Sequence, residues 1–379
     1  MSIVQPIAIL THFKKLRDPR VRRTRKHHLL EIITIALCAT LCGANSWADV
    51  ERFGKSKRKW FARFLKLPGG IPSHDTLGRV FARLDTEAFG RCVRSWLTDW
   101  HGALTGQDVA IDGKTLRGSF DRASGQSPLH LVSAWATGLR LSLGQVAVED
   151  KSNEITAVPK LLELLELTGA VVTLDAMHCQ QATAAAVVER QADYVMTVKA
   201  NQRSLYRMIQ QTFEAYGEQD FKARGLRTQK KTERCHGRVE RREYYVAPLP
   251  AALAKTNRWA GAKSIAMVYR RRESGLRETD EVHYYLSSLP PKVGRLARAI
   301  RGHWGIENTL HWSLDVTFAE DQSRLRRGNG PEIAGALRRL ALSILQQDTS
   351  CPGSLRGKRL QAGWNNDILA KILTGFSAK

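Results

Sequence analysis

The stretch DVAIDGKTLRGS, residues 108–119, decides the fold that we expect for this chain. Its apolar run Val109–Ile111 and the turn residues around it predict a β-strand that ends at Asp112. Two more segments with strand composition follow at Leu129–Thr137 and Leu139–Asp150, separated by Gly, Ser and Pro residues. The three segments together predict an antiparallel meander.

After the meander, helical and strand patterns alternate along the chain. The order is helix, strand, helix, strand and helix, read from NEITAVPKLLELLEL, AVVTLDA, CQQATAAAVVERQ, DYVMTVK and NQRSLYRMIQQTFEAY. Three sequential strands followed by such crossover units are the order of a ribonuclease-H-like mixed α/β sheet.

A β-rich segment then interrupts the helical pattern, which returns after Pro290 and Pro291. We therefore expect five regions. They are an all-helical N-terminal domain (1–100), the first part of the core (101–216), a β-rich insertion (217–290), the second part of the core (291–348) and a basic C-terminal tail (349–379).

The charge of the chain favours a polyanionic partner. The 379 residues include 59 Lys and Arg against 36 Asp and Glu, a formal net charge of +23, which attracts nucleic acid. Residues 14–28 hold eight Lys or Arg in fifteen positions, and these cations either lie along DNA phosphates or form a solvated basic surface. The candidate DNA contacts in this segment are Arg22, Arg23, Arg25 and Lys26.

A short helix beginning after Ser73 is a second candidate for DNA contact. The segment GIPSHDTLGRVFARLD places Leu77, Val80 and Leu84 on one face and Arg79 and Arg83 on another. A DNA-reading helix has this pattern, and so does an ordinary amphipathic packing helix.

Cysteine spacing and hydropathy bear on where the protein resides. The six cysteines form no CxxC pair and no dense framework, which favours reduced thiols without a zinc knuckle. The longest apolar run, Ile32–Ala44, is shorter than the ~20 residues of a membrane span. We expect a soluble, cytoplasmic protein that does not associate with a membrane.

Two aspartates occupy positions where chemistry can occur. Asp112 follows the strand Val109–Ile111, and Asp175 follows the strand Val171–Leu174. Either alone is typical of a turn or a solvated strand end. If the first and fourth strands are neighbours, however, the two carboxylates meet, and such like charges need cations between them.

A third carboxylate comes from RGHWGIENTLHWSLDVTFAEDQSR, residues 301–324, where His303, Glu307, His311 and Asp315 recur every four residues. With Glu307, the acids would hold two Mg²⁺ or Mn²⁺ ions. A zinc site on the histidines is the rival interpretation, although the HExxH spacing is absent. A structural interpretation treats the polar residues as the border of a core stripe made of Ile306, Leu310, Leu314 and Phe318.

Five separate stretches now indicate a family. AIDGKTLRGS, TLDAMHCQ, VKANQ, HGRVERR and GHWGIENTLHWSLDVTFAEDQSR together resemble the H-repeat-associated DDE transposases of insertion sequences, the "As-one" type. The resemblance covers nearly the whole chain. It implies a ribonuclease-H-like core with a β-rich insertion and an acidic triad of Asp112, Asp175 and Glu307.

The chain departs from the wider relatives around the glutamate, where they carry tyrosine, arginine and lysine. At those spacings this sequence has Ile300, His303 and Leu314. We therefore expect His303 to replace the arginine near a phosphate. Trp304 and Trp312 are expected either in the core or stacked on a displaced base.

The expected activity is DNA transposition by two-metal transesterification. The protein would bind the terminal inverted repeats of its element as a homodimer, hydrolyse strands there and join the 3′-hydroxyl ends to target double-stranded DNA. Further phosphate contacts are expected from Lys114, Arg117, Lys199, Arg301 and Arg324, each of which is otherwise a solvated cation. The alternatives are a nuclease that never joins strands and a non-catalytic, domesticated DNA-binding remnant.

Overall fold

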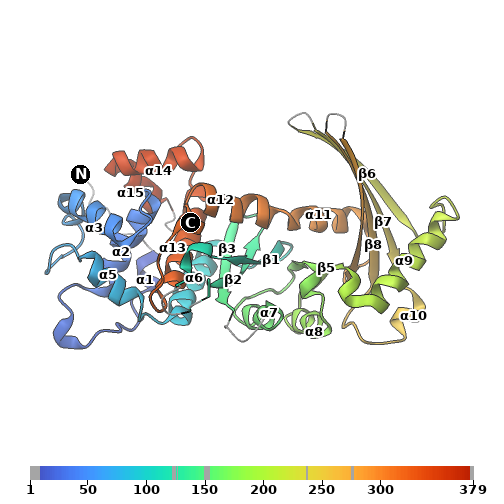
Figure 1. The fold of residues 1–379 in the computed structure, drawn as a ribbon, viewed down its shortest axis with the longest axis horizontal. Coiled ribbons are helices and arrows are strands. Elements are labelled where there is room, and N and C mark those ends of the chain that lie inside the picture. The colour runs from blue at the N-terminus through green and yellow to red at the C-terminus, as the bar shows by residue number, and fades with distance from the viewer. Residues whose placement is uncertain are drawn as a thin grey trace.

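A nine-stranded mixed sheet runs through the protein in the order β3-β2-β1-β4-β5-β9-β8-β7-β6. It is seen in a computed structural model that describes residues 9–121, 125, 127–148, 154–235, 238–274 and 277–375. Figure 1 shows an elongated α/β molecule, with N-terminal helices at one end and the strands β6 to β9 at the other.

The first five strands follow the order that the sequence predicts. The antiparallel meander is β1 (Asp108–Thr115), β2 (His130–Ala136) and β3 (Leu141–Ala147). The parallel strands that continue it are β4 (Val171–Leu174) and β5 (Asp193–Val198), and the intervening helices are α7 (Glu154–Glu163), α8 (Gln181–Glu189) and α9 (Arg203–Gly217). The predicted third strand reached Asp150, but residues 149 and 150 lie outside the described residues.

The β-rich insertion continues this same sheet. Its elements are β6 (Arg227–Cys235), β7 (Arg238–Pro248), α10 (Ala251–Ala254), β8 (Ser264–Ser274) and β9 (Arg277–Ser287). Strand β9 pairs antiparallel with β5, so the two parts share hydrogen bonds. Apolar side chains fill the inner halves of these strands, whereas cross-strand ion pairs such as Arg271–Asp280 occupy the outer halves.

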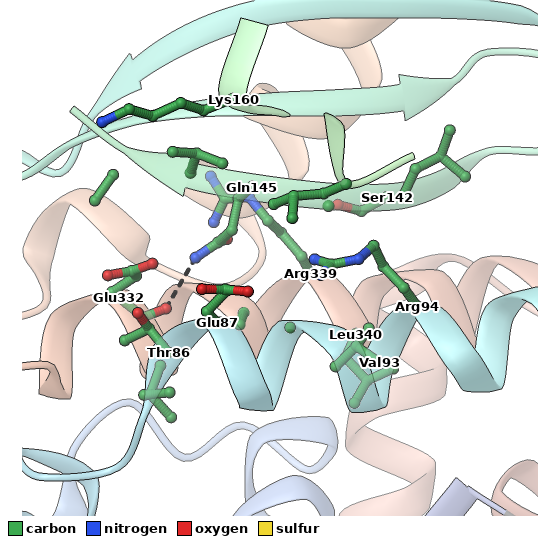
Figure 2. A pocket seen from close by; sticks show the side chains of 18 of the residues that line it. Thr86, Glu87, Val93, Arg94, Ser142, Gln145, Lys160, Glu332, Arg339 and Leu340 are labelled. Atoms are coloured by element: carbon green, nitrogen blue, oxygen red, sulfur yellow. Dashed lines mark hydrogen bonds between the residues drawn. The ribbon is translucent and has the colours of Figure 1, made fainter. Parts of the chain in front are cut away.

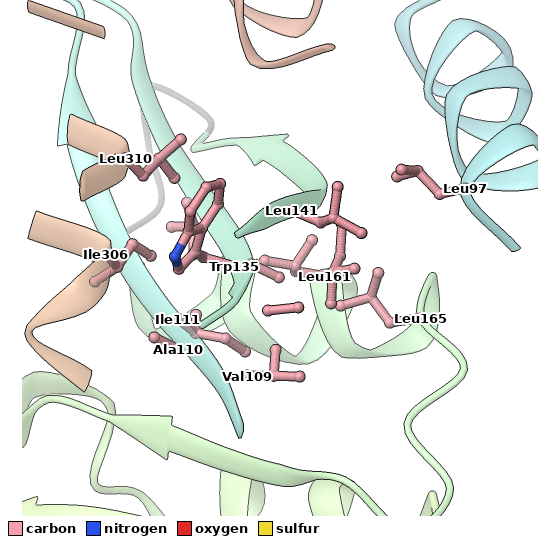
Figure 3. Packing of buried hydrophobic residues seen from close by; sticks show 14 of the residues in the cluster. Leu97, Val109, Ala110, Ile111, Trp135, Leu141, Leu161, Leu165, Ile306 and Leu310 are labelled. Atoms are coloured by element: carbon pink, nitrogen blue, oxygen red, sulfur yellow. The ribbon is translucent and has the colours of Figure 1, made fainter. Parts of the chain in front are cut away.

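One interrupted helix crosses the sheet above the ends of β1 and β4. It consists of α11 (Val293–His303), a π-helical turn (Ile306–His311) and α12 (Trp312–Val316). Ile306 and Leu310 lie over the fully buried Trp135 of β2 (Figure 3). The stripe continues through Leu314 and Phe318, which are also buried, so the core stripe that the sequence predicted is present. Helices α7 and α8 cover the other face (Figure 1).

Six helices precede the sheet in the described part of the chain. They are α1 (Ile9–His12), α2 (Leu29–Leu41), α3 (Trp47–Ser56), α4 (Arg58–Phe61), α5 (His74–Phe81) and α6 (Thr86–His101). Ser73 caps α5 by accepting a hydrogen bond from the Thr76 N–H, and Leu77, Val80 and Leu84 are buried, as predicted. Arg83 lies beyond the end of this helix.

Short 3₁₀ turns connect several of these elements. They span Arg22–Thr24, Arg117–Ser119, Ala176–His178, Ala200–Gln202 and Glu320–Gln322.

The C-terminal region is more structured than the basic tail that the sequence indicated. After α13 (Gly330–Gln347) it forms α14 (Leu355–Trp364) and α15 (Asn366–Thr374). Leu369, Ile372 and Leu373 are buried, and the Arg359 guanidinium donates to the Thr40 carbonyl of α2 at 3.0 Å. Chain ends distant in sequence therefore share one core.

The sequence predicted reduced cysteines and no membrane-spanning segment. Cys38, Cys42, Cys92, Cys179 and Cys351 are free. None of the helices in the described residues has the length and apolar character needed to cross a membrane.

Candidate active site

The register of β1 and β4 brings Asp112 and Asp175 together. Ile111 of β1 lies opposite Leu174 of the parallel strand β4, and each aspartate is the next residue along its chain. Asp175 also caps the 3₁₀ turn that follows it, because its carboxylate accepts the Met177 N–H at 2.8 Å. The two acids therefore stand side by side just past the last parallel pair of β1 and β4. The sequence predicted that the first strand would end at Asp112, but β1 stays paired with β2 as far as Thr115, so Asp112 lies inside the strand.

Glu307 lies in the π-helical turn above these strand ends. Burial raises the pKa of Asp112 to about 7, and the negative charges of Glu307 and Asp175 add to this effect. Burial and the charge of Asp175 likewise raise the pKa of Glu307. The charge of Asp175 therefore disfavours ionisation of both Asp112 and Glu307, as expected where like charges meet without a cation between them.

A small cavity of about 80 Å³ opens beside Glu307. Asp175, His303 and the exposed Lys199 also line it. The π turn matters here, because a wider turn shifts the direction of its side chains relative to a regular helix, and such turns are frequent at functional sites.

We call the four residues His303, Glu307, His311 and Asp315 the ladder, and its two histidines contact different strands. His303 Nδ1 lies 3.0 Å from the Thr173 hydroxyl of β4, whereas His311 Nδ1 lies 3.5 Å from Asp112 Oδ2 of β1. Burial lowers the pKa of His303 to about 4. Burial, with the charges of Arg339 and Lys114, lowers the pKa of His311 to about 3. Both imidazoles are therefore neutral at pH 7 and supply hydrogen bonds without charge.

Neither the ladder nor the three acids form a compact ligand cage. Within the described ranges, no three His, Cys, Asp or Glu side chains lie close enough together to hold a metal ion. The two histidines of the ladder contact two different strands.

Lys114 requires a correction to its expected role in phosphate binding. Its side chain is buried, and its ammonium lies 2.7 Å from Asp315 Oδ1 and 3.0 Å from Asp321 Oδ1. This charge neutralises two carboxylates inside the protein, so it is not available to a DNA phosphate. Asp315, the fourth residue of the ladder, is occupied by the same contact.

The other candidate phosphate contacts differ in their surroundings. Arg301 pairs with Glu233 of β6, with Nη2 and Oε2 3.2 Å apart. Arg117 is largely exposed and lies 3.5 Å from Asp321. The remaining candidate cations are all exposed: Arg22, Arg23, Arg25, Lys26, Arg79, Arg83, Lys199 and Arg324.

The two tryptophans near Glu307 are not core residues. Trp304 is 36% exposed and Trp312 is 56% exposed. The Arg270 guanidinium lies 5.7 Å from the centre of the Trp304 ring, at cation–π distance.

Sequence reasoning missed a polar cluster beneath the strand ends. It is formed by His130, Glu154 and His178, which come from β2, α7 and the turn after Asp175. These residues are 24 to 48 positions apart and share no local motif, so only the tertiary structure shows the cluster.

A larger cavity lies away from the carboxylates. It has a volume of about 490 Å³ and lies between α6, β3, α7 and α13. Figure 2 shows Arg94 and Arg339 extending into it, and Gln145 donates to the Glu332 carbonyl at 2.9 Å. None of Asp112, Asp175 and Glu307 lines this cavity.

Comparisons with known proteins identify the family of the chain. The family described as "Transposase DDE domain" matches residues 104–344, and the family "DDE_Tnp_1-associated" matches residues 10–97. "Putative transposase YncI" of Escherichia coli O157:H7 is 35% identical, with 98% of this chain and 95% of that protein covered. "H repeat-associated putative transposase YhhI" of Escherichia coli K12 is 34% identical, with 97% of this chain and 98% of that protein covered.

Among solved structures, a piggyBac transposase synaptic complex with hairpin DNA aligns at a TM-score of 0.43 and 10% identity, over 99% of this chain and 76% of the other. That alignment is too loose to support an argument. The two family matches and the near full-length relatives are sufficient, and they show that the chain belongs to the DDE transposase family.

Proposed function

We propose that this transposase binds the ends of an insertion sequence, hydrolyses DNA strands there and joins the freed 3′-hydroxyl ends to target DNA. The observation that carries the proposal is the placement of Asp112 and Asp175 side by side, each one residue past the last parallel pair of β1 and β4, with Glu307 in the π turn above them. The pKa values of Asp112 and Glu307 are raised by burial and in part by the charge of Asp175, and divalent cations bound between these carboxylates would offset the repulsion.

The topology supports a ribonuclease-H-like core within the larger sheet. Strands β1 to β5 have the order β3-β2-β1-β4-β5, with an antiparallel meander continued by parallel strands. In this proposal Asp112 comes from the first strand, Asp175 follows the fourth, and Glu307 comes from the helix after the β-rich insertion. The proposed regions are those expected from the sequence, except that residues after 348 include two packed helices.

The donor set fits Mg²⁺ or Mn²⁺ better than zinc. Carboxylate oxygens are the ligands that these hard ions prefer, and no cysteine is among the candidate ligands. Two such ions, when bound, would activate the attacking oxygen and stabilise the leaving one in phosphoryl transfer.

The residues of the chain would position the carboxylates and the DNA. Neutral His311 contacts Asp112, and His303 holds the Thr173 hydroxyl just before Asp175. Exposed cations near the site, Lys199, Arg117 and Arg324, would bind phosphates of double-stranded DNA. Pairing two element ends requires at least two protein copies, so we propose a homodimer on DNA.

The test is cleavage of DNA that carries the element's terminal repeats, with Mg²⁺ and then with EDTA. We expect cleavage with Mg²⁺ alone. Asp112→Ala, Asp175→Ala and Glu307→Ala should each abolish cleavage yet leave DNA binding intact, because they remove ligands and leave the cationic surface unchanged. Asp99→Ala, which changes an exposed acid of α6, is the matched control.

Each contrary result has a defined meaning. Mg²⁺-dependent cleavage by one of the three variants removes that residue from the triad. Cleavage of intact ends without joining of pre-cleaved ends to target DNA would indicate a nuclease. Binding to the repeats without any cleavage would indicate a non-catalytic DNA-binding protein.

A further inference from the structure

The Glu154 carboxylate contacts two histidines on the face of the sheet opposite the Asp112 side chain. Glu154, at the start of α7, lies with Oε1 2.6 Å from His130 Nε2 and with Oε2 3.2 Å from His178 Nε2. His178 is 1% exposed, Glu154 18% and His130 25%. We call these three residues the Glu154 bridge.

The bridge does not require charged histidines. His130 Nδ1 lies 2.8 Å from the Thr115 hydroxyl, so a neutral ring that accepts from Thr115 carries its proton on Nε2. Nε2 lies 2.6 Å from Glu154 Oε1, a close contact that lacks regular hydrogen-bond geometry. His178 Nδ1 has no hydrogen-bond partner among the described residues, so its ring can also donate from Nε2. The contacts with the two histidines lower the pKa of Glu154 to about 2, and the carboxylate stays ionised at neutral pH.

Each end of the bridge is tied to one of the catalytic candidates. His178 closes the 3₁₀ turn that Asp175 caps, three residues after that aspartate. His130 begins β2 and pairs with Thr115 at the end of β1, three residues after Asp112. Glu154 therefore links the turn that carries Asp175 to the end of the strand that carries Asp112.

Gly113 shows how closely the bridge approaches β1. A Cβ atom at this position would overlap the Glu154 carboxylate and the His130 ring. Neighbouring residues of a strand point to opposite faces, so the bridge lies under Gly113 while the Asp112 side chain points to the face covered by His311. The glycine after Asp112 leaves the space that the bridge fills.

We propose that Glu154 is a positioning residue which, through His130 and His178, holds Asp112 and Asp175 in the relative arrangement that the metal-dependent reaction requires. This inference rests on the proposed function, because it assigns a role only if the two aspartates bind cations. Residues that orient metal ligands from behind typically change metal affinity or activity about 10- to 100-fold when they are replaced.

The test measures Mn²⁺ binding to the full-length protein by electron paramagnetic resonance, without DNA, and then the rate of cleavage. His178→Gln retains an N–H donor near the position of Nε2, whereas His178→Leu removes it. The two variants carry the same charge at this position, so they differ from each other in the N–H donor. We expect His178→Leu to weaken Mn²⁺ binding and slow cleavage about 10-fold or more, and His178→Gln to stay close to wild type.

Two further variants keep the inference testable if His178→Leu does not fold. Gly113→Ala should reproduce the loss, because its Cβ displaces the bridge without changing any charge. Glu154→Gln should also weaken binding, whereas Glu163→Gln, which removes the same charge from the other end of α7, should not. Unchanged thermal unfolding and repeat binding would show that these variants fold.

The outcomes separate this inference from the proposed function. If Asp112→Ala and Asp175→Ala bind Mn²⁺ as tightly as the wild type, the metal site itself is wrong. If those two variants lose binding while His178→Leu and Gly113→Ala retain it, the proposed function stands and the positioning role of the Glu154 bridge is overturned.

Discussion

Burial changes the acid–base behaviour of individual side chains in this protein, and Glu332 at the start of α13 is one such residue. Burial raises its pKa from 4.5 to about 7, although a hydrogen bond with Thr86 opposes the shift. The folded protein therefore holds a proton that the unfolded chain releases between these two values. The resulting stabilisation is complete below pH 4.5 and is lost as the pH rises through about 7.

Glu332→Gln tests this linkage. The amide resembles the protonated acid and cannot ionise, so we expect the variant to match wild-type stability near pH 5 and to exceed it at pH 8.5. Urea unfolding at the two pH values gives the measurement. A stability difference that is the same at both would contradict a raised pKa.

The two histidines of the ladder give a second prediction for single residues. His303→Gln and His311→Gln should slow cleavage without changing which metal supports it, because neutral His303 and His311 contact Thr173 and Asp112 and are not the proposed ligands. Elemental analysis of the purified variants provides the check. A stoichiometric zinc that is present in the wild type and lost from either variant would contradict the two-magnesium proposal.

Among the elements, the basic segment of residues 14–28 is the clearest candidate for DNA contact. Deleting residues 1–28 is a poor test of DNA contact, because the deletion also removes Ile9, Phe13 and Leu16, which are buried in the core. A variant in which Arg22, Arg23, Arg25 and Lys26 are replaced by Gln keeps that packing, since all four side chains are exposed.

We expect this fourfold variant to bind the terminal repeats more weakly and with a shallower dependence on salt. Each lost phosphate contact reduces the slope of log affinity against log salt concentration by about 0.9. Binding measured between 50 and 200 mM salt, about the range over which this effect is large, gives the slope. An unchanged slope would mean that the segment is solvated and does not contact DNA.

The helix that carries Glu307 shows the limit of periodicity arguments. Apolar spacing predicted the buried stripe from Ile306 to Phe318, and these residues are in the core. The same spacing did not predict the π-helical turn Ile306–His311, whose Ile306 and Leu310 side chains lie over Trp135 (Figure 3). The spacing placed His303 and His311 on one helix face, but it did not predict that they contact different strands, at Thr173 and Asp112.

On the scale of the whole molecule, helices from both ends of the chain pack into one hydrophobic core. Helix α13 packs against α2, α5 and α6 as well as β3. We expect a fragment of residues 102–379 to be insoluble or to lack cooperative unfolding, because it exposes the faces of α13 and β3 that these helices cover. Circular dichroism during heating tests this, and a fragment with a sharp, reversible transition would show that the core is independent.

Local patterns in the sequence determined the order of the elements from β1 to α9, the cap at Ser73 and the position of Asp175 just after β4, because these depend on neighbouring residues. They did not determine that β1 continues past Asp112 to Thr115 or that the C-terminal region forms α14 and α15. The ribonuclease-H-like order of elements also made β1 and β4 expected neighbours, and they pair in the structure. Only the tertiary structure decided that β9 would pair with β5, that Lys114 would be buried between Asp315 and Asp321, and that Glu154 would meet His130 and His178. Those contacts join residues far apart in the chain, and their free energy depends on how the complete core packs rather than on any local pattern.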